Sequence, residues 1–273
     1  MSLDHIWCAM DAEGVIKVTV LASPNPGRTA MLFASSPHSN EEAKLVGQVI
    51  DRTCRGLRES DIGLAQALIE PSERLDQEAF GLGGLARLAT LTYMERPVPR
   101  RRDGATPPDI PEGIRLERYQ SEDRRTLEEL LTRTYEQTLD CPGLAGLRRP
   151  SDVVEGHIHS GVFRPEWWFL ARRGSEAVGV SLMNGSIGSS SIELVYLGIV
   201  PEERGRGLGP ALLRHGLNVI AGSRERNVVL AVDEANAPAL AMYKNAGFRR
   251  TIRREAFVRT TRTDVAKSDA ADG

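Results

Sequence analysis

The stretch that decides the fold is Ile192-Glu-Leu-Val-Tyr-Leu-Gly-Ile-Val-Pro-Glu-Glu-Arg-Gly-Arg-Gly-Leu-Gly209. Its first half is rich in the β-branched and aromatic residues that favour strands. Its second half has glycines at positions 205, 207 and 209, which allow backbone angles that side chains forbid and let the chain approach a ligand closely. A helix is expected to start near Pro210, so that loop N–H groups and the positive end of a helix dipole converge. The pattern predicts a strand, a pyrophosphate-binding loop and a helix.

The glycine loop does not match the two most familiar phosphate motifs. It lacks the Lys-Ser/Thr end of a P-loop, and its spacing differs from Gly-x-Gly-x-x-Gly. Taken alone, it is also compatible with a plain tight turn. The residues that follow give it context: Asn227–Asp233 has the pattern of a buried strand, and a short helix follows in which Asn236 is the cap, Pro238 lies in the first turn and Gly247 ends the helix.

The order of strand, Arg-x-x-Gly-x-Gly loop, helix, strand, Asn-capped helix, Tyr243 and Gly247-Phe248 resembles the GCN5-related N-acetyltransferase (GNAT) superfamily over residues 112–260. The resemblance implies an α/β fold of mixed α+β character, with a mixed central β-sheet flanked by helices. It also implies that acetyl-CoA is bound between two parallel strands that splay apart, and that no metal is needed.

Proline composition divides the chain. Residues 97–113 contain five prolines, which prevent regular ladders and indicate a linker. We therefore expect one domain over residues 1–96 and another over residues 114–263. Residues 264–273 are small and polar, and they are expected to be a disordered tail.

The first half resembles the second when it is shifted by 163 positions. Leu64–Glu70 then falls on Asn227–Asp233, and Gly84-Leu85 falls on Gly247-Phe248, which suggests two GNAT-like units in tandem. Chance similarity is the alternative. The residues Glu41-Glu-Ala-Lys-Leu-Val46, which replace the glycine loop, would repel a pyrophosphate, and Phe80 replaces Tyr243. Nothing in the first half corresponds to residues 114–163, so the first unit is expected to be truncated and degenerate.

The second half begins with a predicted strand at Gly113–Arg118 and a helix opened by Ser121-Glu-Asp. A second short helix is expected over Ser151–His159, and a hairpin over Trp167–Met183. The helix after the glycine loop should bury Leu213, Leu217 and Ile220, and the helix opened by Ser121 should use Leu127, Leu130, Leu131 and Tyr135 as its core face.

The resemblance also implies roles for single residues. Tyr243 matches the tyrosine that faces the thiolate in the family, so it would be a general acid; the alternative is an amphipathic core tyrosine. Glu193 occupies the position of a base that often acts through water; the alternative is an exposed carboxylate. The residues expected to bind the coenzyme, in addition to Tyr243, are Leu197, Gly198, Ile199, Val200, Arg204, Gly205, Arg206, Gly207, Leu208, Gly209 and Asn236.

Several positions stay open at this stage. Gly198 would suit a β-bulge, and Asn236 can be a plain helix cap. Asp140 can hold a cationic amine or belong to an ordinary turn, and Tyr196 can face the acceptor or the core. Cys141 would be a nucleophile only beside a histidine such as His157, which direct transfer does not require.

The composition of the chain limits the classes of partner and the location that we expect. A net charge of −2 gives no bulk electrostatic signal for nucleic acid. No apolar run has the length of a membrane span, and the first residues lack signal-peptide features. Cysteines at positions 8, 54 and 141 fit neither a metal nor a disulfide spacing, so a reducing cytoplasm is the expected location.

The sequence therefore predicts an N-acetyltransferase that moves the acetyl group of acetyl-CoA to a primary amine by direct attack. The alternative is a non-catalytic acyl-CoA-binding sensor or scaffold. The sequence also allows an enzyme whose donor is an acyl-CoA with a longer acyl chain. The acceptor can be a small molecule or a peptide. The oligomeric state is open, with a monomer that contains an intramolecular pseudo-dimer as one possibility.

Overall fold

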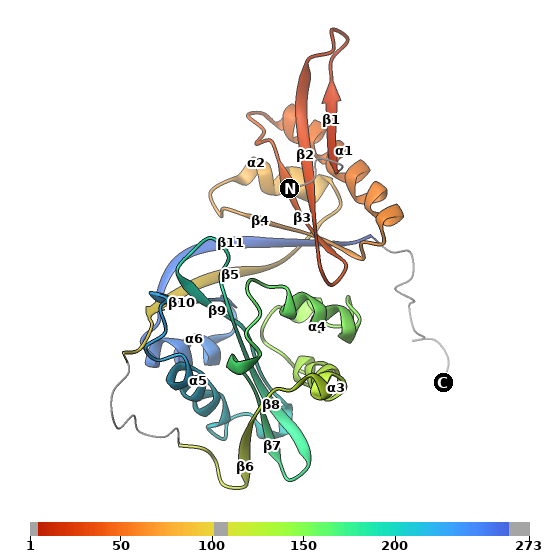
Figure 1. Cartoon of the computed structure of the whole chain (residues 1–273). Coiled ribbons are helices and arrows are strands. Elements are labelled where there is room, and N and C mark those ends of the chain that lie inside the picture. The colour runs from red at the N-terminus through yellow and green to blue at the C-terminus, as the bar shows by residue number, and fades with distance from the viewer. Residues whose placement is uncertain (1–4, 101–108, 262–273) are drawn as a thin grey trace, which may run out of the picture. The chain divides into compact units, whose positions relative to one another are not determined.

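The structure, a computed structural model, describes residues 5–100 and 109–261 (Figure 1). The expected tail at 264–273 and residues 101–108 of the expected linker lie outside the described residues. The internal contacts of the chain define two units. Unit 1 comprises residues 1–89, 146–148 and 254–273, and unit 2 comprises residues 90–145 and 149–253.

Unit 1 is a sheet with two helices. Its strand order is β1-β2-β3-β4-β11, antiparallel except for the parallel pair β3–β4. Its elements are β1 (Ile6–Met10), β2 (Ile16–Asn25), β3 (Thr29–Ala34), α1 (Asn40–Gly56), η1 (Leu57–Ser60), β4 (Leu64–Ile69), α2 (Arg74–Leu82), the start of β5 (Ala86–Pro97) and the end of β11 (Arg249–Thr260).

Unit 2 contains the rest of β5 and β11. Its strand order continues β5-β10-β9-β8-β7-β6, antiparallel except for the parallel pair β9–β10. The further elements are β6 (Ile114–Arg118), η2 (Ser121–Asp123), α3 (Arg124–Tyr135), η3 (Pro142–Leu144), α4 (Pro150–Ile158), η4 (Pro165–Trp167), β7 (Trp168–Arg173), β8 (Glu176–Gly185), β9 (Ser191–Ile199), η5 (Pro201–Glu203), α5 (Leu208–Val219), β10 (Asn227–Asp233) and α6 (Ala237–Asn245).

Helices cover both faces of the unit 2 sheet, with α3 and α4 on one side and α5 and α6 on the other (Figure 1). Two adjacent residues of β9, Gly198 and Ile199, illustrate the two faces of the sheet. A Cβ at Gly198 would lie 3.0 Å from Thr134 of α3, whereas Gly179, which pairs with the next residue Ile199, faces Leu212 of α5. Leu127, Leu130 and Leu131 of α3 are buried, as are Leu213, Leu217 and Ile220, so both predicted core faces are confirmed for these leucines and the isoleucine.

The internal repeat is visible element by element. A shift of 163 positions brings α2 onto α6 and β5 onto β11 with identical bounds, and it brings β4 onto β10 within one residue. The first repeat therefore runs from β1 to β5, and the second from β7 to β11. Among the described residues, β6, α3 and α4 have no counterpart in the first repeat. The prediction of tandem GNAT-like units, the first lacking its opening elements, agrees with this order.

The last strand of each repeat pairs outside its own repeat. Residues Leu91–Pro97 of β5 pair with β10 in unit 2, and residues Glu255–Thr260 of β11 pair with β4 in unit 1. The registers are equivalent, because the pair Asn227–Pro97 becomes the pair Leu64–Thr260 under the same shift. The boundary between the two contact units therefore falls inside β5 and inside β11.

Two local expectations need correction. The helix opened at Ser121 is capped by Gln120 instead, whose backbone N–H donates to Asp123 Oδ2 at 3.0 Å while its side chain accepts in return. Tyr135 is half-buried, and Thr134 takes its place in the buried face of α3. The first turn is a 3₁₀-helix, which shifts the phase of the helix that follows.

Among residues 5–100 and 109–261, no helix combines the length and the apolar character that crossing a membrane requires.

We predict that Phe257→Ala destabilises unit 1, although residue 257 lies near the end of the chain. Phe257 is 5% exposed within the unit 1 core, so its truncation should cost about 3–5 kcal/mol. Ile252→Ala in the same strand is the control, because Ile252 is 48% exposed and should change stability by less than about 0.5 kcal/mol. The measurement is hydrogen–deuterium exchange in a peptide covering β4. Unchanged protection of β4 in Phe257→Ala would contradict the exchanged pairing.

Candidate active site

The two parallel strands of unit 2 diverge after a short paired segment. β9 and β10 pair at Ser191–Asn227, Ile192–Val228 and Glu193–Val229 and no further. β9 then continues to Ile199 along β8, while β10 continues to Asp233 along β5. The strand edges that face each other beyond Glu193 are therefore unpaired within the described sheet. Such a fork can accept an extended ligand as an added strand.

A β-bulge in β9 sets which side chains face α3 and α4. Tyr196 lies opposite Leu182, and Leu194 lies opposite the next residue Met183, so Val195 is the extra residue. Residues three apart across a bulge share a face, which residues three apart in a regular strand do not. The bulge therefore turns Tyr196 to the same side as Glu193.

The expectation of a bulge at Gly198 is wrong, since Gly198 pairs regularly with Val180. The glycine is needed for a different reason. A Cβ at this position would lie 2.6 Å from the ring of Tyr196 and 3.0 Å from Thr134. The absent side chain makes room for the Tyr196 ring to lie back over its own strand.

Glu193 sits at the last paired residue of the fork. Its carboxylate accepts from Ser160 Oγ at 3.4 Å. Burial raises the pKa of Glu193, and the hydrogen bond from Ser160 partly offsets this by favouring the charged form. A raised pKa makes a carboxylate a stronger proton acceptor, which suits a general base.

Tyr196 packs among aromatic side chains of α3 and α4. Its ring lies 5.3 Å from that of His157 and 5.9 Å from that of Tyr135, and its hydroxyl shares a 2.8 Å hydrogen bond with Thr134 Oγ1. Burial raises the pKa of Tyr196 well above its usual value, and the nearby charge of Asp140 adds to the rise. The phenol is thus held neutral on the Glu193 side of the sheet.

The glycine loop presents unused backbone donors. Gly205 and Gly207 have φ values of +73° and +83°, and a Cβ at either position would meet no described atom within 4 Å. Within the described residues, the N–H groups of residues 205–209 donate to no backbone carbonyl, and the first bond of α5 runs from Ala211 to Gly207. α5 begins at Leu208, two residues before the expected start. Its open N-terminus offers an anion site.

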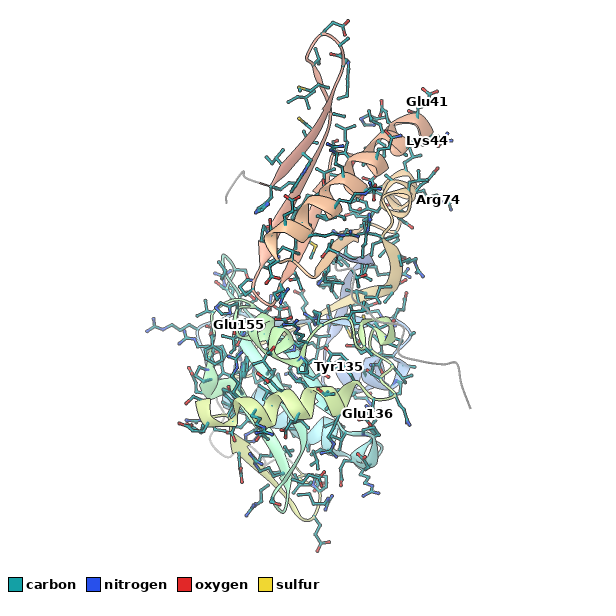
Figure 2. The ribbon with its side chains drawn as sticks, turned by 90° about the vertical axis from the view of Figure 1, so that its right-hand side faces the viewer. Glu41, Lys44, Arg74, Tyr135, Glu136 and Glu155 are labelled. Atoms are coloured by element: carbon teal, nitrogen blue, oxygen red, sulfur yellow. The ribbon has the colours of Figure 1, made fainter. Side chains whose placement is uncertain are left out.

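Arg204 is placed differently from the other loop residues. Its guanidinium donates to the carbonyls of Ile199 at 3.0 Å, Gln137 at 2.9 Å, Thr134 at 3.0 Å and Glu136 at 2.7 Å. The last three carbonyls lie at the C-terminal end of α3, where Figure 2 labels Tyr135 and Glu136. Arg204 thereby satisfies helix-end acceptors and ties α3 to β9. Arg206 is the loop cation that remains exposed, 3.8 Å from Glu203.

Tyr243 and Asn236 lie on α6. Asn236 Oδ1 accepts from the Ala239 N–H at 3.2 Å, so the side chain is a helix cap. Tyr243 is buried, and its ring meets that of Phe248 edge-on with 5.8 Å between centroids. Burial raises the pKa of Tyr243 strongly, and the charge of Asp140 raises it further. The phenol therefore keeps its proton at neutral pH.

Asp140 is locked to the end of β10 by a reciprocal pair of hydrogen bonds. Its Oδ1 accepts from the Asp233 N–H at 2.8 Å, and Asp233 Oδ2 accepts from the Cys141 N–H at 3.1 Å. Burial raises the pKa of Asp140. Because Asp140 affects the pKa of both Tyr196 and Tyr243, its carboxylate lies within electrostatic reach of both side chains.

Cys141 and His157 are not assembled for nucleophilic or metal chemistry. Burial raises the pKa of the Cys141 thiol to about 12, so the reactive thiolate is scarce. The His157 ring packs on Tyr196. In the part of the chain that the structure describes, no group of three or more His, Cys, Asp or Glu residues could hold a metal ion.

The profile of the Acetyltransferase (GNAT) family matches residues 126–248, a range that contains α3, the fork, the glycine loop and Tyr243. This segment is a GNAT domain.

Curated relatives of the GNAT domain carry the name mycothiol acetyltransferase. The protein from Thermobispora bispora is 33% identical over 179 residues, which cover 61% of this chain and 56% of the relative. The protein from Acidothermus cellulolyticus is 38% identical over 101 residues, which cover 32% of this chain and 31% of the relative. The alignments thus span about half or less of the relatives' length.

Solved structures resemble the chain over nearly its whole length. A GCN5-related N-acetyltransferase from Sphaerobacter thermophilus has a TM-score of 0.63 at 18% identity, covering 97% of this chain and 84% of that chain. A tandem GNAT protein from the clavulanic acid biosynthesis pathway has a TM-score of 0.55 at 15% identity, covering 95% and 83%. At these identities the likeness shows the fold, which is the tandem GNAT fold.

The corresponding helix start in unit 1 is closed by its own side chains. Ser39 Oγ accepts from the Glu42 N–H at 3.2 Å, and Glu42 Oε2 accepts from the His38 N–H at 2.7 Å. These two hydrogen bonds occupy backbone N–H groups at the start of α1, whereas the N–H groups at the start of α5 donate to no backbone carbonyl among the described residues. The two carboxylates at the start of α1, Glu41 and Glu42, also disfavour a second anion.

Sequence reasoning missed three residues of this region: Thr134, Ser160 and Asp233. Each of these residues bonds to a partner that is distant in the sequence, so no local sequence spacing predicts its role. The pairing of Asp140 with Asp233 spans 93 positions, and that of Thr134 with Tyr196 spans 62.

We predict that Gly207→Glu weakens the binding of acetyl-CoA at least tenfold in calorimetry. The substitution puts a negative charge among the open N–H groups of the loop. Gly188→Glu is the matched control, because Gly188 also has a positive φ (+76°) and open surroundings but lies in the β8–β9 turn. Equal affinities of the two variants would remove the loop from the binding site.

Proposed function

We propose that unit 2 is an N-acetyltransferase that moves the acetyl group of acetyl-CoA to a primary amine by direct attack. One observation carries the proposal: the fork between β9 and β10 opens beside a helix start whose backbone N–H groups are unused. The fork suits an extended pantetheine, and the helix start suits a pyrophosphate. The relatives named mycothiol acetyltransferase support the same reaction class.

The residues available for the coenzyme fit its two parts. Gly205, Arg206, Gly207, Leu208 and Gly209 would hold the pyrophosphate through backbone N–H groups, with Arg206 as the nearby cation. Leu197, Gly198, Ile199 and Val200 would present the free edge of β9 to the pantetheine. Arg204 would act indirectly by holding the loop against α3, and Asn236 by starting α6.

Acetyl-CoA would supply an acetyl thioester, so transfer forms a C–N bond, breaks the C–S bond, releases a proton from the amine and requires one at the departing sulfur. Tyr243 would donate the proton at sulfur, since its buried phenol carries a proton at neutral pH. Glu193 would accept the amine proton, directly or through a water. The two groups come from different elements, Tyr243 from α6 and Glu193 from β9.

The acceptor would bind where Tyr196 and Asp140 lie. The Asp140 carboxylate uses one oxygen to hold Asp233, and its remaining acceptor capacity can face a cationic amine. Tyr196 would shape the pocket beside Glu193. The relatives named mycothiol acetyltransferase favour a small-molecule amine over a peptide.

The first repeat would be a degenerate partner with no coenzyme of its own. In this view, residues 1–96 and 114–263 are two ancestral GNAT units joined by the segment 97–113. The first keeps the order of strands and helices but has a self-capped helix start and Phe80 in place of Tyr243. Each chain should then bind one acetyl-CoA.

Calorimetric titration with acetyl-CoA tests this proposal. A stoichiometry of one, lost in Gly207→Glu, followed by acetylation of an amine in a small-molecule screen, is the expected result. Two sites per chain would show that unit 1 also binds. Binding without turnover on any amine would favour the sensor or scaffold function over the enzyme.

We predict that Tyr243→Phe lowers kcat by about ten- to a thousandfold and leaves the Kd for acetyl-CoA nearly unchanged, because the variant loses only the proton donor. Tyr119→Phe is the control: Tyr119 is another buried tyrosine of unit 2, packed against Trp168 at 5.3 Å. Single-turnover kinetics would separate chemistry from product release. If Tyr243→Phe turned over like Tyr119→Phe, Tyr243 would have no part in the chemistry.

We predict that Ser160→Ala moves the acidic limb of the kcat/KM profile to higher pH. A base works above its pKa, and the Ser160 hydrogen bond lowers the pKa of Glu193, so its loss leaves burial less opposed and raises that pKa. Ser175→Ala, in the exposed β7–β8 turn, should leave the limb in place. In Glu193→Gln the limb should disappear and the rate should fall. An acidic limb at the same pH in the wild type and in Ser160→Ala would exclude Glu193 as its source.

A further inference from the structure

The outer edge of β1 is an edge of the unit 1 sheet that no described strand covers. β1 stands last in the strand order and pairs with β2 alone among the described residues. Its counterpart in the second repeat is β7, whose outer edge is covered by β6 over Ile114–Arg118. The first repeat has no described equivalent of β6, so the same edge lacks its covering strand.

Backbone groups on this edge point outward. The Ala22 N–H donates to the His5 carbonyl at 2.9 Å, which fixes the residues of β1 that bond to β2. Bonding alternates along an antiparallel pair, so Ile6 and Cys8 direct their N–H and C=O groups away from β2. In the described chain these groups have no backbone partner.

The composition of β1 is that of an interior strand. Its sequence, Ile-Trp-Cys-Ala-Met, contains no charge and no proline, the two devices that usually prevent edge-to-edge association. Ile6 is 44% exposed and Met10 is 61% exposed on the same side of the strand as Cys8. The β1 edge has no charge and no proline, and it carries exposed apolar side chains. Such an edge is typical of a strand that pairs with a strand of another chain.

We propose that two copies of the chain associate through β1, antiparallel, about a two-fold axis at Cys8. In this register Cys8 lies opposite Cys8 of the second copy, and Ile6 lies opposite Met10 of the second copy. The outward N–H and C=O groups of Ile6 and Cys8 then find partners. The apolar cross-strand pairs cover the exposed side chains. This inference goes beyond the proposed function and does not depend on it.

The charges of α1 favour the same partner. The start of α1 carries Glu41, Glu42 and Lys44, and its end carries Asp51, Arg52 and Arg55, with Arg55 paired to Asp51 at 2.6 Å, so the start is net negative and the end net positive. Figure 2 shows Glu41 at the first turn. A two-fold axis at β1 sets two copies of α1 side by side and antiparallel, so the acidic start of each faces the basic end of the other. Between β1 and α1 lies a groove of about 700 Å³, lined by Trp7, Leu45 and Arg52 among others, into which side chains of the second copy can reach.

Sedimentation velocity over a concentration series tests the association. The wild type should reach twice the 29.9 kDa chain mass, whereas Met10→Lys should stay monomeric because it places a charge in the apolar edge. Ile187→Lys is the control: Ile187 is 77% exposed and belongs to the β8–β9 turn of unit 2. Unchanged circular dichroism would show that Met10→Lys still folds, as its 61% exposure suggests. A monomeric wild type at the highest concentration would overturn the proposal.

Disulfide trapping tests the register. Directly opposed, hydrogen-bonded residues have Cα atoms about 5.5 Å apart, within disulfide range. Mild oxidation should therefore crosslink Cys8, which is exposed, and Cys8→Ser should abolish the crosslink, since Cys54 and Cys141 are buried. In the Cys8→Ser background, Ile6→Cys should crosslink only when mixed with Met10→Cys. Like residues would be roughly 13 Å apart along the strand. A dimer that shows none of these crosslinks, or that persists in Met10→Lys, would place the interface elsewhere and overturn the proposal.

Discussion

The arrangement of unit 2 depends on which edges of β10 are hydrogen-bonded to neighbouring strands. A strand that pairs on both edges along its whole length leaves no opening, and one that pairs on neither edge does not stay in the sheet. β10 pairs with β5 over Leu91–Pro97 and leaves β9 after Val229. Full pairing on the β5 side is what allows β10 to give up pairing on the other side. The fork, and with it every proposed binding group, follows from that asymmetry.

Two equivalent arginines reinforce the exchanged strands. Arg96 on β5 donates to the carbonyl of Ala246 at the end of α6, and Arg259 on β11 donates to the carbonyl of Gly83 at the end of α2 at 2.6 Å. A shift of 163 positions converts one contact into the other. Each strand thereby caps the helix that precedes its counterpart in the other repeat: β5 caps α6, which precedes β11, and β11 caps α2, which precedes β5. Arg96 also lies 5.8 Å over the ring of Phe248, which in turn packs on Tyr243. The first repeat thus contributes a side chain to the support of the proposed general acid.

Much of this architecture could be predicted from sequence, because it is encoded locally. The strand at Asn227–Asp233, the cap at Asn236 and the turn at Gly247 each depend on neighbouring residues, and the structure confirms all three. The strand exchange could not be predicted. β5 and β11 carry equivalent patterns, and pairing within a repeat or between repeats would satisfy the same pattern. The bulge at Val195 was missed for a related reason: it depends on the register with β8, which no single strand specifies. Arg204 matched a motif, yet its guanidinium serves α3 carbonyls 67 to 70 positions away.

The exchange gives the first repeat a structural role that does not require a ligand of its own. Residues 41–46 contain no glycine, whereas the order β1 to β5 matches the order β7 to β11. Loss of β5 itself would strip β10 of its full-length partner and close or unfold the fork. β5 is therefore the element of the first repeat on which the fork depends. The element bounds of β5 and α2 match their counterparts residue for residue, whereas Tyr243 and the loop do not.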